Sequence, residues 1–337
     1  MSGKRIVLSL GAAVLILFLL PHLFSMEYYL HIFVMSEIYA VLALSLSLLV
    51  GFTGQVSMGH AAFYGMGAYA SALLSVRLDM SFWITFWIAG IFAGLVAFFI
   101  GKLVLRLRGH VLAITTAFFG VLVTVVMNNW IPVTNGPMGI TGIPRPSPFS
   151  IFGVNIALES RMDYYYLGLL FVAGVLYLLW RIESSRIGDA MIAVRENEEL
   201  AKSIGIDTMK SKVFAFTLSG GLAGLAGAFY AHYILFISPV TFNISESINM
   251  LVMVIFGGMS TLFGPVFGAI CLTVLPEFLR MAGELRLVIC GIALVFSSSG
   301  CPWACGNNAE LSSTEKRVNS FVLPLLQHFF PNFARRL

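Results

Sequence analysis

The sequence predicts an all-α fold, a polytopic transmembrane bundle of about nine or ten helices. Apolar residues make up 58% of the 337 positions and charged residues only 11%, whereas soluble domains carry roughly 25% charged residues. The mean hydropathy is +0.91. So few charges cannot build the water-facing surface of a protein this long, and lipid must therefore cover much of the chain. Repeated long apolar runs, with basic residues in alternate connections, complete the prediction.

Nine apolar runs are candidate spans, because a helix needs about 20 mostly apolar residues to cross a bilayer. No small-residue cleavage site follows the first run, so we expect an uncleaved span and not a signal peptide. The eighth run is interrupted by Gly257 and Gly258, and it could be one long helix or two half-helices. In chain order the runs cover 5–24, 30–51, 58–76, 82–105, 110–131, 164–181, 212–237, 246–276 and 285–296.

Basic residues set the orientation of these spans. Lys4 and Arg5 precede the first span, and the connection after the fourth span is also basic. The loop 182–212, after the sixth span, holds the largest group of Lys and Arg. We therefore expect a cytoplasmic N-terminus and a cytoplasmic loop at 182–212. The loop 132–163 is then on the outer side, and its Gly and Pro content favours turns.

The loop 182–212 contains a predicted amphipathic helix. Residues 189–204 place apolar side chains on one stripe at helical spacing, with charged residues on the rest of the surface. Gly205 follows in the position of a C-cap. Such a helix needs the membrane surface, the bundle or a partner protein to cover its stripe.

The stretch "GFTGQVSMGHAAFYGMGAYASALL", residues 51–74, mixes glycines and polar residues into apolar sequence. Irregular backbone at membrane depth is tolerated only inside protein or beside water. Two interpretations stay open: a segment that lines or gates a solute path, or a tight inner turn whose polar groups cap helix ends. The candidates for the path are Thr53, Gln55, Ser57 and His60.

Small residues spaced four apart indicate close helix contacts. The pairs Gly220-x-x-x-Gly224 and Ala223-x-x-x-Gly227 lie in the seventh span. Because such spacing is common in any helical membrane bundle, it predicts packing and not a binding site. The predicted packing glycines are Gly65, Gly220, Gly224, Gly227, Gly257 and Gly258.

No catalytic, metal or cofactor site is predicted. The chain lacks the G-x-x-x-x-G-K-[ST] pattern that holds nucleotide phosphates, and its intramembrane histidines lack ligand partners at metal spacing. Among ionisable residues in the spans, Glu37 is the main candidate, and we expect it at the outer edge where the second span begins. A transporter with neither an ion relay nor a nucleotide site takes its energy from another subunit or is a passive channel.

Five stretches, in order along residues 36–296, resemble the permease subunits of bacterial branched-chain amino-acid ABC importers. The long outer loop favours the larger of the two paired permeases. The stretches are residues 51–74 quoted above, "NGPMGITGIPRP", "RIESSRIGDAMIAVRENEELAKSIGI", "FTLSGGLAGLAGAFYA" and "MLVMVIFGGMSTLFGPVFGAI".

The resemblance implies a permease domain of ABC importer type at 1–296, in the bacterial inner membrane, with 132–163 as a periplasmic loop. It implies import of Leu, Ile or Val together with a second permease subunit in a heterodimer, two cytoplasmic ATPase subunits and a periplasmic binding protein. No cofactor and no nucleic acid are expected. Related permeases carry urea or short amides, and a stand-alone facilitator or channel is the alternative from another class.

The resemblance also gives the inner helix a role. ABC importers carry an E-A-A-x-x-x-G motif that docks on the ATPase, and residues 199–205 match it with Leu in place of one Ala. The residues implied in this coupling are Arg195, Glu196, Glu199, Ala201 and Gly205.

Three features depart from the family pattern. Ser47 stands where the family often has Asn, and Asp189 where it often has Arg. The composition changes abruptly at Ser297, and the tail 297–337 resembles nothing in these permeases, so we assign it no function.

Overall fold

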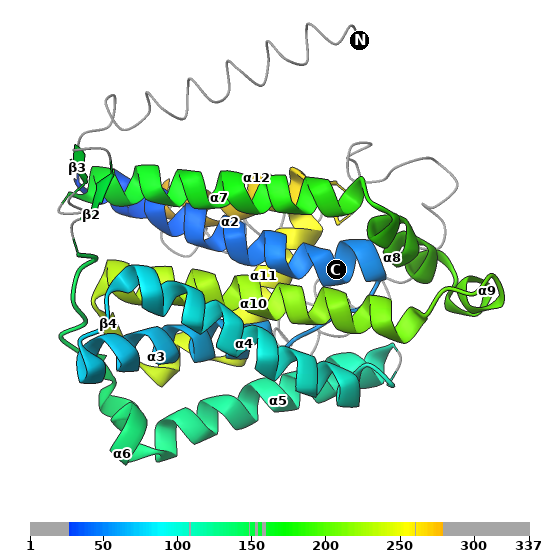
Figure 1. Ribbon diagram of the computed structural model, residues 1–337, viewed down its shortest axis with the longest axis horizontal. Coiled ribbons are helices and arrows are strands. Elements are labelled where there is room, and N and C mark those ends of the chain that lie inside the picture. Colours follow the sequence, from blue (N-terminus) through cyan, green and yellow to red (C-terminus); the bar gives the residue numbers. More distant parts are fainter. Residues whose placement is uncertain are drawn as a thin grey trace, which may run out of the picture.

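The computed structural model describes residues 27–107, 109–147, 149–151, 154–156, 160–259 and 261–278. Long helices lie side by side along its longest axis (Figure 1). Five of them are long and apolar enough to cross a membrane, and the predicted all-α polytopic fold is confirmed. They are α2 (Glu27–Thr53), α4 (Phe82–Val104), α5 (His110–Asn129), α7 (Arg161–Glu183) and α10 (Thr208–Ile234). The predicted spans 5–24 and 285–296 and the tail 297–337 lie outside the described residues.

Within the described residues, three shorter helices pack with these five: α3 (His60–Leu78), α11 (Ile244–Gly257) and α12 (Gly264–Phe278). The stretch 246–276 is thus two half-helices, because Gly258, with a φ of 104°, ends α11 in a conformation that favours glycine.

The outer surface of α4 and α5 is apolar. Phe118 of α5, for example, is 71% exposed. The exposed residues along α4 are Ile84, Trp87, Ile88, Ile91, Phe92, Leu95, Phe99 and Leu103, with Lys102 in the last turn. Apolar side chains at these positions suit contact with lipid tails.

Short strands and turns close one end of the bundle, which we call the strand end. Strand β1 (Ile140–Thr141) pairs antiparallel with β4 (Phe236–Ile237), with Ile140 opposite Ile237. The hairpin of β2 (Phe149–Ile151) and β3 (Val154–Ile156), the short helix α6 (Ile131–Thr134) and the 3-10 turn η1 (Gly136–Met138) belong to the same connection.

His232 of α10 fastens this connection to the bundle. Its Nδ1 donates to the carbonyl of Pro144 at 2.8 Å, because a carbonyl can only accept. Its Nε2 then accepts from the hydroxyl of Ser71 at 3.0 Å or of Ser75 at 3.2 Å. A buried histidine therefore fixes one segment of the loop 132–163.

The opposite end, which we call the α9 end, carries α8 (Arg186–Glu196) and α9 (Glu198–Ser203), seen on the right of Figure 1. Helices α2 and α10, each of 27 residues, run antiparallel through the core between the two ends. They touch where the hydroxyl of Ser219 donates to the carbonyl of Ser45 at 2.6 Å. Each of these two helices is followed by a stretch without α-helix that turns back into the bundle.

Candidate functional site

The first of these stretches, residues 54–59, carries the chain from the end of α2 back into the bundle. Ser45 Oγ lies 2.7 Å from Nε2 of His60, the first residue of α3. Ser45 is about two helical turns, roughly 12 Å, before the last residue of α2. Helix α3 therefore begins inside the protein and not at its end.

The break between α2 and α3 leaves backbone N–H groups without a partner in a helix, and side chains of other helices accept hydrogen bonds from them. The N–H of Met58 donates to Thr116 Oγ1 of α5 at 3.1 Å, and the N–H of Ala61 donates to Ser247 Oγ of α11 at 2.9 Å. A Cβ on Gly59 would collide with the carbonyl of Thr116. Irregular backbone can persist at membrane depth when protein groups satisfy it in this way.

The four predicted path residues lie at this break in two different states. The hydroxyl of Thr53 donates to the carbonyl of Leu49, and the amide of Gln55 donates to the carbonyl of Thr53. Ser57 Oγ and His60 Nδ1 are buried and have no hydrogen-bond partner among the described residues. Thr53 and Gln55 thus hydrogen-bond to nearby backbone carbonyls, as polar residues of a turn do. Ser57 and His60 each have one buried polar atom without a hydrogen bond among the described residues.

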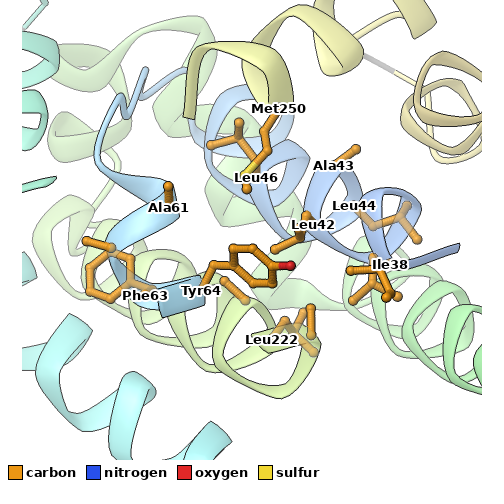
Figure 2. Close-up of a cluster of buried hydrophobic side chains, with 14 of the residues drawn as sticks. Ile38, Leu42, Ala43, Leu44, Leu46, Ala61, Phe63, Tyr64, Leu222 and Met250 are labelled. Carbon is orange, nitrogen blue, oxygen red and sulfur yellow. The ribbon is translucent and has the colours of Figure 1, made fainter. Parts of the chain in front are cut away.

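The second stretch, residues 235–243, enters the bundle from the strand end. It contains the 3-10 turn η2 (Pro239–Phe242). The ring of Phe242 packs 5.0 Å from Tyr64 and 6.0 Å from Tyr69 of α3, so α11 also starts inside. Figure 2 shows Tyr64 between α2 and α10, and Met250 of α11 close to Leu46.

The hydrogen bond from Ala61 to Ser247 joins the starts of α3 and α11. From there α11 runs to the α9 end, where the chain at Met259 touches the backbone of Gly51. Helix α12 returns toward the strand end, where Tyr28 donates a hydrogen bond to Glu277. In many secondary transporters the substrate site lies where two interrupted helices meet near the middle of the membrane.

Glu246 lies in the first turn of α11 and is a residue that sequence reasoning missed. The Tyr39 hydroxyl, near the middle of α2, interacts with its carboxylate. The run 246–276 puts Glu246 at the edge of a span, but the inward turn of residues 235–243 carries it deeper. The signal in the sequence is the group of polar residues between two apolar runs, "NISESIN" at 243–249.

The expected position of Glu37 was wrong. Helix α2 begins at Glu27, so Glu37 lies well inside it, and its Oε2 is buried without a hydrogen-bond partner among the described residues. A Cβ on Gly168 of α7 would collide with this carboxylate, which places Glu37 at the contact between α2 and α7.

The expected single helix at 189–204 is also wrong, because the segment is two helices separated at Asn197. The side-chain oxygen of Asn197 accepts from the N–H groups of Glu199 and Leu200, at 3.0 Å each, and so begins α9 with an N-cap. The predicted stripe is divided as well. Val194 and Ala201 are buried, whereas Leu200 and Ile204 are 63% and 70% exposed.

Arg195 of α8 and Glu198 of α9 bond to the core helices α2 and α10. Arg195 Nη1 donates to the carbonyl of Gly51 at 2.8 Å, and its guanidinium also pairs with Glu196. Glu198 Oε2 binds Nζ of the buried Lys212, in the first turns of α10, at 2.7 Å. Sequence reasoning missed Glu198 and Lys212, because nothing local shows which charges of the loop turn inward.

Glu198 is held in its charged form. Partial burial acts to raise the pKa of its carboxyl, but hydrogen bonds from Lys212 and Lys202 outweigh it and lower the pKa to about 2. Gly205, with a φ of 87°, ends the α9 turn, and its N–H donates to the carbonyl of Lys202.

Five of the six predicted packing glycines lie where another helix or turn comes close, and for Gly258 the structure shows only that it ends α11. Gly220 and Gly224 face Ala97 and Ala93 of α4, and Gly227 faces the backbone of α3. Gly65 faces Phe242, Gly257 touches the backbone of Gly264, and Gly258 ends α11. No group of three His, Cys, Asp or Glu residues that could hold a metal ion occurs in the part of the chain that the structure describes.

A family model for the permease component of branched-chain amino acid transport systems matches residues 28–298. The chain belongs to this permease family. It is a multi-pass membrane protein, and the five long apolar helices found among the described residues agree with that membership.

Named relatives of this permease include LivM and LsrC proteins. It is 34% identical, over 77% of its length, to the high-affinity branched-chain amino acid transport system permease protein LivM of Salmonella typhimurium, and 35% identical over the same share to LivM of Escherichia coli. The chain spans 66% of the length of each of these two relatives. It is 26% identical to the autoinducer 2 import system permease protein LsrC of Yersinia pseudotuberculosis, over 81% of this chain and 76% of LsrC. No solved structure matches the chain.

Proposed function

We propose that this permease is the membrane subunit of an ATP-driven importer that carries branched-chain amino acids into the cytoplasm across the bacterial inner membrane. Separate ATPase subunits supply the energy by docking on α8 and α9. The proposal is carried by the arrangement of the α9 end. Its segment 199–205 exposes the apolar side chains of Leu200 and Ile204. A hydrogen bond from Arg195 joins this end to α2, and an ion pair from Glu198 joins it to α10.

The contacts provide a path for movement. Arg195 binds the last turn of α2, and Glu198 binds the first turns of α10. These two helices lead into the two breaks at which α3 and α11 begin. A rigid displacement of α8 and α9 would therefore shift both breaks together, as expected when closure of a motor domain moves packed helices.

The rest of the assembly follows from the same orientation. With the α9 end in the cytoplasm, the strand end faces the periplasm, where a substrate-binding protein would deliver the solute. A second permease subunit would complete the path as a heterodimer, and two ATPase subunits would serve the pair. The LivM relatives support branched-chain amino acids as the solute.

Uptake and ATPase docking test the proposal in one experiment. The exposed apolar side chain of Leu200 is changed in Leu200→Asp, and the motif in a Glu199→Ala, Gly205→Val double variant. The matched control is Leu78→Asp at the strand end, because Leu78 is also 63% exposed. We expect both α9 variants to insert, to lose the co-purifying ATPase and to lose ATP-dependent leucine uptake, and the control to keep both. Normal docking and uptake in both α9 variants would contradict the coupling role.

A stand-alone facilitator makes the opposite prediction. Liposomes that hold this chain alone would then show leucine flux without ATP or a binding protein. We expect no such flux.

A further inference from the structure

The inference concerns Glu246, whose carboxylate lies deep in the membrane-spanning bundle. Tyr39, which interacts with it, is roughly 18 Å along α2 from its first residue at 1.5 Å per residue. Ser247, the next residue, caps the buried start of α3. An ionisable group at this depth is costly and usually has a functional partner.

The carboxylate is incompletely satisfied. Oε2 accepts a long hydrogen bond, 3.4 Å, from the side-chain amide of Asn249, and the Tyr39 hydroxyl also interacts with the carboxylate. Oε1 is buried and has no hydrogen-bond partner, and no Lys, Arg or His of the described chain pairs with Glu246. A carboxylate oxygen in this state lacks a cation or an N–H donor.

The exposed surface of α11 beside Glu246 is polar, whereas the exposed surfaces of α4 and α5 are apolar. Ser245 and Asn249, one turn apart on the same side of Glu246, are the exposed residues of α11. Exposed positions on α4 and α5 at membrane depth carry Ile, Leu, Val and Phe instead. Polar side chains at this depth face water or protein and not lipid.

We propose that Glu246 binds the ammonium group of the transported amino acid, at a site inside the translocation path that the exposed polar edge of α11 lines. This proposal rests on the function proposed above. The orphan Oε1 supplies the negative charge, and the Tyr39 hydroxyl and Asn249 amide stand beside it as hydrogen-bonding groups for the same solute. The second permease would close the path from the side that Ser245 and Asn249 face.

Thiol labelling tests the site without depending on transport. Asn249→Cys is made in a chain whose four cysteines, Cys271, Cys290, Cys301 and Cys305, are replaced by Ala, and the complete importer is assembled with it. The probes are two membrane-impermeant thiosulfonate reagents of similar size, one a quaternary ammonium and one a sulfonate. The lipid-facing control is Phe118→Cys.

We expect Asn249→Cys to react and Phe118→Cys to stay unreacted. We also expect the cationic reagent to react at least about tenfold faster than the anionic one, and addition of Glu246→Gln to remove this preference. An unreactive Asn249→Cys would show that lipid or protein covers this edge of α11. The covering protein could be the second permease, with one of its own cations paired with Glu246. That result, or equal rates for the two reagents, would overturn the proposal.

Leucine uptake separates this proposal from the proposed function. If the unmodified importer takes up leucine, Glu246→Gln should lower uptake per assembled complex at least about tenfold, and Glu246→Asp should lower it less. Glu37→Gln, at the contact with α7, removes another buried carboxylate and should keep uptake. Normal uptake by Glu246→Gln would overturn the ammonium site alone, whereas no leucine uptake by the unmodified importer would overturn the proposed function.

Discussion

Gly59 shows at the residue scale why the first break needs a particular amino acid. The backbone of α5 at Thr116 occupies the space where a Cβ would be, whereas nothing lies within 4 Å of a Cβ built on Gly174 of α7. Glycine is needed at position 59 because no side-chain atom fits there, and not because of the backbone conformation, since a φ of −106° is open to any residue.

We therefore expect Gly59→Ala to lower the free energy of unfolding by about 1–3 kcal/mol, the usual cost of overpacking. Gly174→Ala should have little effect or stabilise slightly, because Ala favours the helix. Thermal unfolding of both purified variants in detergent provides the comparison. Equal melting temperatures would show that α3 and α5 do not approach as described.

Glu198 gives a prediction about pH. Its carboxyl has a pKa of about 2 in the folded protein, against an ordinary value of 4.5. The ion pair with Lys212 therefore stabilises fully above about pH 4.5, and its contribution is lost as the pH falls toward 2. At pH 7, Glu198→Gln leaves the Lys212 ammonium buried without its partner, at a cost of about 3 kcal/mol.

Thermal unfolding of this variant and the unmodified protein, measured from pH 7 to pH 3, checks the prediction. The difference in stability should be constant above pH 5 and shrink below pH 4.5. Glu196→Gln, which removes a more exposed carboxylate, is the control and should show a smaller difference. A difference for Glu198→Gln that grows on acidification would contradict the assignment.

At the scale of elements, long-range hydrogen bonds hold the broken helices in place. The first turn of α3 depends on Ser247, 186 residues later in the chain. Loss of that hydroxyl leaves the N–H of Ala61 buried and unpaired.

Ser247→Ala should therefore destabilise the protein by about 1–3 kcal/mol, the cost of an unsatisfied buried donor. Ser47→Ala should cost less, because the Ser47 hydroxyl only donates to the Leu44 carbonyl of its own helix. Hydrogen exchange of residues 60–64 should rise in the first variant and not in the second. Unchanged protection there would mean that Ser247 does not cap α3.

The same elements show what local sequence can predict. The run 82–105 matches α4, Phe82–Val104, because hydrophobic length alone sets such a span. The break at 54–59 could not be placed in depth, since its position depends on Thr116 and Ser247, which are distant in the chain. Glu37 was misplaced because α2 begins earlier than expected, at Glu27, and Glu246 was overlooked because residues 235–243 turn into the bundle before α11 begins.

At the scale of the whole molecule, the two central helices connect one end to the other. Under the proposed coupling, movement of α8 and α9 would reach α2 through Arg195 and α10 through Glu198, and these two helices end at the breaks from which α3 and α11 begin. Family membership agrees with the motif at 199–205 that the sequence already shows. The side proposed here for a second permease could not be predicted from the sequence, because the proposal depends on which residues of α11 are exposed in the folded chain.

Transport by reconstituted vesicles tests the central claim most directly, namely that a separate motor drives this permease through its α9 end. Labelled leucine uptake is measured in vesicles that hold this chain with the second permease, the ATPase subunits and the binding protein, and in vesicles that hold this chain alone. The account predicts accumulation against a gradient only in the complete set and only with ATP. Accumulation by the chain alone, or by the complete set without ATP, would contradict it.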